Sequence, residues 1–289
     1  MFEGFDILIP AFVLCLLMIL THSYFGLHVL ARGIIFVDLA LAQVAALGIS
    51  IAFLLGKESH GIESQLYAFT ATLIISFAFA LLRKIPEKVS REVIIGCVYV
   101  VSTALSIVIL SQSSQGMEEL KSILNGNILW VSWQEIAVVA GAYLLVSLLH
   151  LTYLTQFKKL SFDIEIGKDN ERDGHKEQAE KMETPSFIWE FLFFASFAIV
   201  ITLAVNIAGV LLVFAFLIIP AFSASLLQKQ FSSQFIKQLL LAWGLGITGC
   251  LIGLAIAFNA DLPVGATIVS FFGLLPVFAA MVSMLKKQR

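Results

Sequence analysis

The stretch RGIIFVDLALAQVAALGISIAFLLG, residues 32–56, decides how this chain folds. It is apolar almost throughout, yet it carries Asp38 and Gln43. A carboxylate facing lipid would be costly, so ionisable residues in such runs face protein or a water-filled path. The two residues are five positions apart, about 140° around a helix, and do not share a face. We therefore expect a buried membrane helix with both polar side chains turned inward.

Small residues recur at every fourth position of the same stretch. Ala42, Ala46 and Ser50 form a stripe, and stripes of this kind let helix backbones approach closely. The pattern predicts that this helix packs on other helices.

The composition of the whole chain is that of a membrane protein. Of its 289 residues 59% are hydrophobic and 13% are charged, and the mean hydropathy is +0.95. A soluble domain carries about a quarter charged residues, so lipid must cover much of this surface. The formal net charge of −2 argues against a nucleic-acid partner. We expect an all-α polytopic protein with one transmembrane domain, residues 1–289.

Apolar runs long enough to cross a bilayer define the topology. Nine such runs have centres near residues 18, 45, 74, 101, 145, 197, 218, 247 and 275. Of the 18 Lys and Arg residues, 16 fall on one side if the N-terminus is outside and the C-terminus inside. The connection at Asn206 and Ile207 is short, so the sixth and seventh spans are either separate or one broken helix.

The largest inner loop, residues 158–186, is charged. Residues 158–187 hold eight of the 20 acidic residues and six basic ones. The loop is either a solvated linker or a docking surface for a cytoplasmic subunit. If it docks a subunit, its first part, KKLSFDIEI, is the expected contact, because apolar residues lie among its charges.

Asp38 has two roles open to it at the start of its helix. It could pair with Arg32, His28 or a backbone amide, where a carboxylate suits the helix dipole. It could instead line a polar translocation path. His22 and His150 lie near span ends, where we interpret them as interfacial or hydrogen-bonded histidines.

Motifs for catalysis or nucleotide binding are missing from the sequence. It has no Gly-x-x-x-x-Gly-Lys-Ser/Thr phosphate loop, no Gly-x-Ser-x-Gly and no His-Glu-x-x-His. We expect a chain that neither binds ATP nor catalyses a reaction, and that carries no cofactor.

Six motifs in consistent order resemble the permeases of the metal-ion (zinc, manganese, iron) ABC transporters. The motifs are GLHVLARGIIFVDLALAQVAALGISIAFLLG (26–56), SREVIIGCVYV (90–100), LNGNILWVSWQE (124–135), LSFDIE (160–165), AGVLLVFAFLIIPAFSASLL (208–227) and DLPVGATIV (261–269). Within these motifs, the residues that match the family's structural positions are Gly33, Gly48, Gly209, Pro220, Asp261, Pro263 and Gly265. The resemblance implies a homodimer in the bacterial inner membrane, with a cytoplasmic ATP-binding subunit and an external metal-binding solute receptor.

The chain departs from that family at two places. The family has an Asp and a His four apart on its second span, and alignment puts Leu39 and Gln43 there. Asp38 stands one residue earlier, about 100° around the helix. The candidate path residues are therefore Asp38, Leu39 and Gln43, with Asp38 a transient metal ligand.

The second departure lies in the inner loop. The family continues from SFD into a short helix that couples to the ATP-binding subunit, and here IEIGKDNERDGHKEQAEKMETP follows instead. The resemblance makes Phe162, Asp163 and Ile164 the candidate coupling residues.

The favoured function is the permease of an ATP-driven importer of a divalent metal ion. A secondary transporter or channel for a small cation, with no ATP-binding partner, is the alternative. A membrane-embedded enzyme is more distant, because no nucleophile and base stand together in the sequence.

Overall fold

The structure, a computed structural model, describes residues 3–58, 61–84, 90–163, 186–228 and 235–287, and all regular elements of this part are helices. The longer helices are α1 (Glu3–Arg32), α2 (Val37–Leu54), α3 (Ile62–Leu81), α4 (Arg91–Leu110), α6 (Trp133–Thr152), α10 (Phe187–Leu227) and α11 (Phe235–Asn259). The shorter ones are α5 (Gly116–Asn125), α7 (Leu154–Lys158), α12 (Val264–Phe272) and α13 (Leu274–Lys287), with single turns at Leu82–Lys84, Ile128–Trp130 and Lys159–Asp163.

Eight helical stretches in the described residues are long and apolar enough to cross a membrane. Seven of them match one predicted span each; the most C-terminal of these seven, Val264–Leu285, combines α12 and α13. The remaining stretch is α10, which has 41 residues. At 1.5 Å per residue such a helix would be about 60 Å long, twice the hydrocarbon thickness of a bilayer.

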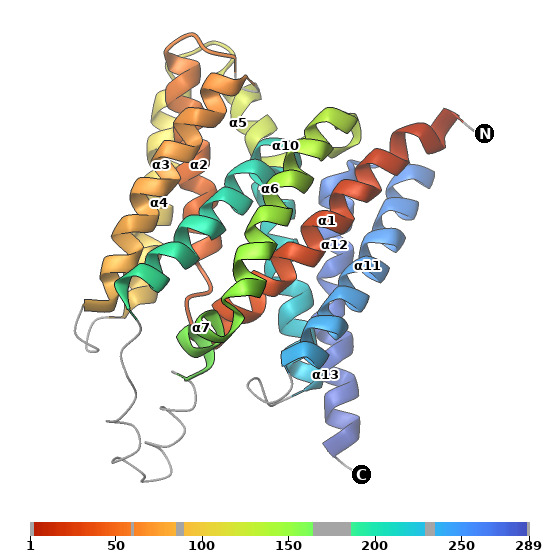
Figure 1. Cartoon of the computed structure of the whole chain (residues 1–289). Coiled ribbons are helices and arrows are strands. Elements are labelled where there is room, and N and C mark those ends of the chain that lie inside the picture. The colour runs from red at the N-terminus through yellow and green to blue at the C-terminus, as the bar shows by residue number, and fades with distance from the viewer. Residues whose placement is uncertain (1–2, 59–60, 85–89, 164–185, 229–234, 288–289) are drawn as a thin grey trace.

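A break at Gly209 divides α10 into two halves. Its φ of 77° and ψ of 160° are not helical. Phe197, before the break, stacks on Phe25 of α1, and a Cβ on the neighbouring Gly26 would meet the carbonyl oxygen of Leu217, after the break. Both halves therefore pack on the same part of α1, and Figure 1 shows the first half rising and the second running back down. The break lies close to the predicted connection, and each half of α10 is about as long as one membrane crossing. The number of spans and the orientation stay predictions.

The segment after α5 packs directly on this break. The amide of Asn127 donates to the carbonyl of Ile207 at 2.9 Å. A Cβ on Gly126 would lie 2.1 Å from the carbonyl carbon of Ala208, and one on Gly209 would lie 2.3 Å from the Gly126 nitrogen. Backbone meets backbone here, which explains why both LNGNILW and AGVLLV carry a glycine.

The burial of α2 confirms the interpretation of residues 32–56. Ala42, Ala46 and Ser50 are buried, and a Cβ on Gly48 would lie 2.6 Å from the Cα of Ala68 in α3. The small-residue stripe thus faces protein. By contrast α3, α4 and α6 expose long apolar faces, so α2 is an interior helix of the bundle.

The remaining motif positions lie at turns and helix ends. Gly33 follows α1 with a φ of 63°, and Pro220 is buried in the second half of α10. Asp261 has a φ of 51° in the turn after α11, and Pro263 precedes α12. A Cβ on Gly265 would lie 3.2 Å from the carbonyl oxygen of Asn125. These residues lie where the backbone turns or where helices begin and pack closely.

Candidate functional site

Asp38 lies in the first turn of α2 and is fully buried. Its exposed fraction is 0%, and neither carboxylate oxygen has a hydrogen-bond partner among the described residues. Phe36 precedes the helix, and no side chain caps it. Burying a charged group without a partner costs several kcal/mol, so this position calls for a bound proton or cation.

The pairing role considered for Asp38 is wrong. Arg32, at the end of α1, forms a buried ion pair with Glu190 of α10. His28 is joined through Nδ1 to the hydroxyl of Ser161 at 2.7 Å. Because both groups have other partners and α2 has no side-chain cap, Asp38 is not held as a helix-start contact.

Leu39 and Gln43 lie on a different side of α2 from Asp38. Gln43 is 5% exposed, and Leu39 and Leu47, one turn to either side, are half-buried. This is the least covered face of the helix, whereas Asp38 is enclosed by the protomer. The structure thus brings Leu39 and Gln43 together and keeps Asp38 apart from them.

Sequence analysis did not single out Tyr143 of α6, which is buried next to His22. The Tyr143 ring lies 5.8 Å from the ring of His22 in α1, centroid to centroid. His22 is fully buried, and its Nδ1 lies 2.9 Å from the carbonyl oxygen of Met18. Of its two interpretations, the hydrogen-bonded histidine is therefore confirmed and the interfacial one is wrong. Its sequence signal was an imidazole inside the apolar run that starts at Ile7.

The candidate coupling segment, Leu154–Asp163, follows α6 and packs against α1. Phe162 is 3% exposed and packs against Leu27, Ala221 and Phe235. This corrects the expectation that its ring is a surface anchor, because a ring buried in its own chain does not enter a groove in a partner. Asp163 ends the turn Lys159–Asp163, and Ile164 lies outside the described residues.

Hydrogen bonds and stacked rings hold the start of this segment. Tyr24 donates its hydroxyl hydrogen to Nδ1 of His150 at 3.0 Å, and Nε2 of His150 lies 2.8 Å from the hydroxyl of Ser196. Ser196 itself donates to the carbonyl of Phe193, so the imidazole donates through Nε2. Phe157 of α7 stacks on His150 at 3.9 Å. The segment is therefore fixed to α1, α6 and α10.

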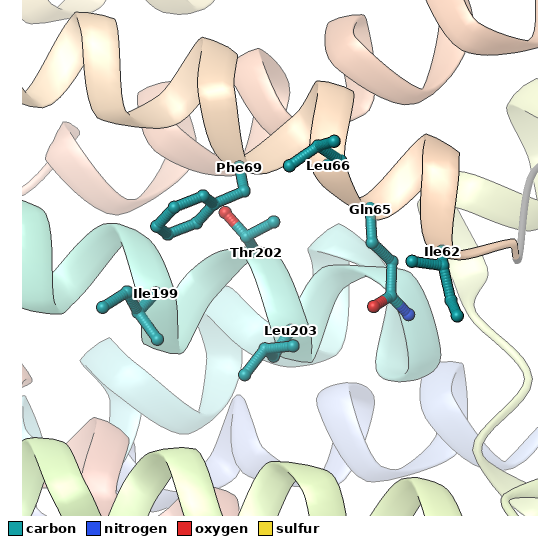
Figure 2. A pocket seen from close by; sticks show the side chains of 7 residues that line it. All are labelled: Ile62, Gln65, Leu66, Phe69, Ile199, Thr202 and Leu203. Carbon is teal, nitrogen blue, oxygen red and sulfur yellow. The ribbon is translucent and has the colours of Figure 1, made fainter.

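A separate cavity of about 370 Å³ lies between α3 and the first half of α10. Figure 2 shows its lining residues: Ile62, Gln65, Leu66, Phe69, Ile199, Thr202 and Leu203. Thr202 is already hydrogen-bonded to Thr72 at 3.0 Å. None of the described residues that line it carries a carboxylate or an imidazole, so these residues offer a metal ion no such ligand.

Comparison with known proteins identifies relatives along nearly the whole chain. A model of the ABC 3 transport family matches residues 4–283. A probable metal transport system membrane protein of Thermotoga maritima is 25% identical over 251 residues, covering 86% of this chain and 81% of the relative. The manganese import system permease protein ScaB of Streptococcus parasanguinis is 24% identical over 258 residues, covering 88% and 84%.

A solved structure has the same fold. PsaBC from Streptococcus pneumoniae, in complex with Fab, superposes with a TM-score of 0.71 at 20% identity, covering 96% of this chain and 92% of that one. The matches confirm the resemblance read from the six motifs and the all-α polytopic fold class. The chain is a multi-pass membrane protein.

Proposed function

The chain belongs to the ABC 3 transport family, and we propose that it is the membrane-spanning permease of an ATP-driven importer of a divalent metal ion. In this proposal a second copy completes the translocation path, a cytoplasmic subunit hydrolyses ATP, and an external receptor delivers the ion. The chain itself is a transport subunit without an ATPase site.

The carboxyl group of Asp38 is the observation that carries this proposal. It is fully buried in an interior helix and has no hydrogen-bond partner in the described part of the chain. Ionisable residues in membrane interiors are retained where they serve ions or protons. A carboxylate is also an oxygen ligand that a passing divalent cation uses. The names of the relatives, which include metal and manganese transport, support a metal ion as the cargo.

The least covered face of α2 is our proposed wall of the path. Leu39 and Gln43 lie on it, at the positions where the family has its Asp and His. Neither side chain is ionisable, so we propose that this face guides the ion and that Asp38 binds it.

The segment Leu154–Asp163 is our proposed route of coupling to the ATP-binding subunit. Phe162 and Ser161 tie it to α1, α10 and α11, so a push on the neighbouring inner loop would reach these helices. Asp163, and Ile164 beyond it, would lie at the contact, while Phe162 transmits the movement.

Substitution of Asp38 by Asn tests the proposal. The permease, its ATP-binding subunit and its receptor are reconstituted in vesicles, and uptake of radioactive Mn²⁺ and Zn²⁺ is followed with and without ATP. We expect ATP-dependent uptake by the parent, and its near abolition in Asp38→Asn, because the amide keeps the shape and loses the charge. Size-exclusion chromatography should show an unchanged assembly.

Two outcomes would contradict the proposal. Uptake that continues without ATP or without the ATP-binding subunit would favour the secondary transporter or channel. Normal uptake by Asp38→Asn would mean that the ion does not need this carboxylate.

A further inference from the structure

His150, in the last turn of α6, is the buried residue against which the segment Leu154–Asp163 begins to pack. Its exposed fraction is 2%. The ring of Phe157, in α7, lies 3.9 Å from the His150 imidazole, centroid to centroid, with only 8° between the two planes. Phe157 is itself fully buried. The face of the imidazole is therefore a direct contact of the segment.

The edge of the same imidazole is bonded to two other helices. Nδ1 accepts from the hydroxyl of Tyr24 on α1, and Nε2 donates to the hydroxyl of Ser196 on α10. A rotation or displacement of the ring would break both bonds and leave buried polar atoms unpaired, which is costly. His150 thus joins α7 by its face to α1 and α10 by its edge.

Tyr24 carries the same contacts on to the end of the segment. Its ring lies 5.3 Å from that of His150 at 89°, and 5.9 Å from that of Phe235 in α11 at 85°. Phe235 in turn lies 5.3 Å from Phe162, ring to ring. The start and the end of the segment therefore contact one connected group of buried rings.

We propose that His150 is the positioning residue through which a movement of the segment Leu154–Asp163 reaches the membrane helices. This inference rests on the proposed function and adds to it the point of transmission. The stacked face of the imidazole follows α7, and its two hydrogen bonds carry the displacement to α1 and α10. A phenyl ring at position 150 would keep the stacking on Phe157 and lose both hydrogen bonds.

The amount of Mn²⁺ taken up for each ATP hydrolysed, in vesicles that hold the permease, its ATP-binding subunit and its receptor, tests this role. His150→Phe should lower that ratio about fivefold or more, because two hydrogen bonds are lost, while ATP hydrolysis continues. A residue that only stabilises the fold would instead reduce the amount of active complex. Uptake and hydrolysis would then fall together, with their ratio unchanged.

Two matched tyrosine variants test the role with a smaller change. Tyr24→Phe removes only the hydroxyl that donates to His150 and should lower the ratio about twofold or more. Tyr143→Phe is the control, because Tyr143 is also buried and its hydroxyl donates to the carbonyl of Val200 at 3.1 Å. Its ring lies beside His22. The control should keep the ratio of the parent.

Thiol labelling measures the packing of the segment without relying on transport. Leu160 is fully buried, so Leu160→Cys should react slowly with a maleimide in a permease whose Cys15, Cys97 and Cys250 are replaced by alanine. His150→Ala removes the stacking as well as both hydrogen bonds, and should raise the labelling rate of this cysteine about tenfold or more. Tyr143→Phe should leave the rate unchanged.

Three results would overturn the role of His150. They are a parental ratio of uptake to hydrolysis in folded His150→Phe, equal ratios in Tyr24→Phe and Tyr143→Phe, and parental labelling of Leu160→Cys after His150→Ala. The tyrosine pair decides the question if the His150 variants do not fold. A parent whose uptake does not depend on ATP would refute the importer instead, and faster labelling after His150→Ala would still show that His150 holds the segment.

Discussion

Replacing Gly209 with alanine should destabilise the permease by about 3 kcal/mol or more, because two costs add. The φ of 77° and ψ of 160° lie in a region that is open almost only to glycine, at a cost of about 1–3 kcal/mol. The new Cβ would also lie 2.3 Å from the Gly126 nitrogen and 2.5 Å from the Asn125 carbonyl carbon. Both neighbours are backbone atoms, so relief of the clash would have to separate the α5 segment from α10.

Two other glycines separate these costs. Gly33 has a φ of 63°, but a Cβ there would meet nothing within 4 Å, so Gly33→Ala should cost only about 1–2 kcal/mol of conformational strain. Gly141 lies inside α6 with open space around its Cα, so Gly141→Ala should be stabilising by up to about 1 kcal/mol.

Denaturation in mixed micelles, followed by tryptophan fluorescence, gives the free energy of unfolding of each variant. The expected order of stability is Gly141→Ala, parent, Gly33→Ala and Gly209→Ala. Equal stability of Gly209→Ala and Gly33→Ala would refute the close approach of the two backbones. It would also mean that this contact does not cause the reversal of α10.

Three further predictions follow from other parts of the structure. Arg32→Met should cost about 3–5 kcal/mol by leaving Glu190 buried without its partner, and adding Glu190→Met should recover most of that loss; equal instability of the single and double variants in the denaturation assay would argue against the ion pair. A cysteine at Glu118 should react with an impermeant thiol reagent from outside and one at Lys159 only from the cytoplasm, and the reverse pattern would overturn the charge-based orientation. Phe162→Ala should lower ATP-driven uptake and reduce co-purification of the ATP-binding subunit, because the empty space frees the coupling segment; unchanged uptake and assembly would place the coupling contact elsewhere.

The sequence predicted the features that follow from local periodicity. Ala42, Ala46 and Ser50 recur every fourth residue, and they are buried. A carboxylate in an apolar run has to face inward, and Asp38 does. The short connection at Asn206 and Ile207 marked the break that lies at Gly209. In each case helix geometry and the cost of polar groups in lipid act within a few residues, so the pattern can be read without tertiary contacts.

Contacts between distant positions could not be predicted in this way. Glu190 is 158 positions from Arg32, and Ser161 is 133 from His28. No periodicity links such residues, so Arg32 and His28 remained candidate partners for Asp38. The apolar residues of KKLSFDIEI pointed to a surface contact for a similar reason. Phe162 was assigned to a partner because its neighbours are charged, but a pocket of its own chain holds it.

The position of Asp38 links the departure from the family pattern to the proposed translocation path. A carboxylate at position 39 would share the least covered face of α2 with residue 43, because four positions bring two side chains to within about 40°. A shift of one residue turns it by about 100°, away from that face and into the protomer, where its side chain is fully buried. Residue 43 is out of reach of Asp38 on that side, so a histidine at position 43 could not bind an ion together with Asp38. Gln43 therefore removes no ligand that Asp38 could use. The two changes therefore belong together: the acid moves into the protomer, and a histidine at position 43 would no longer have an acid on its own face of the helix.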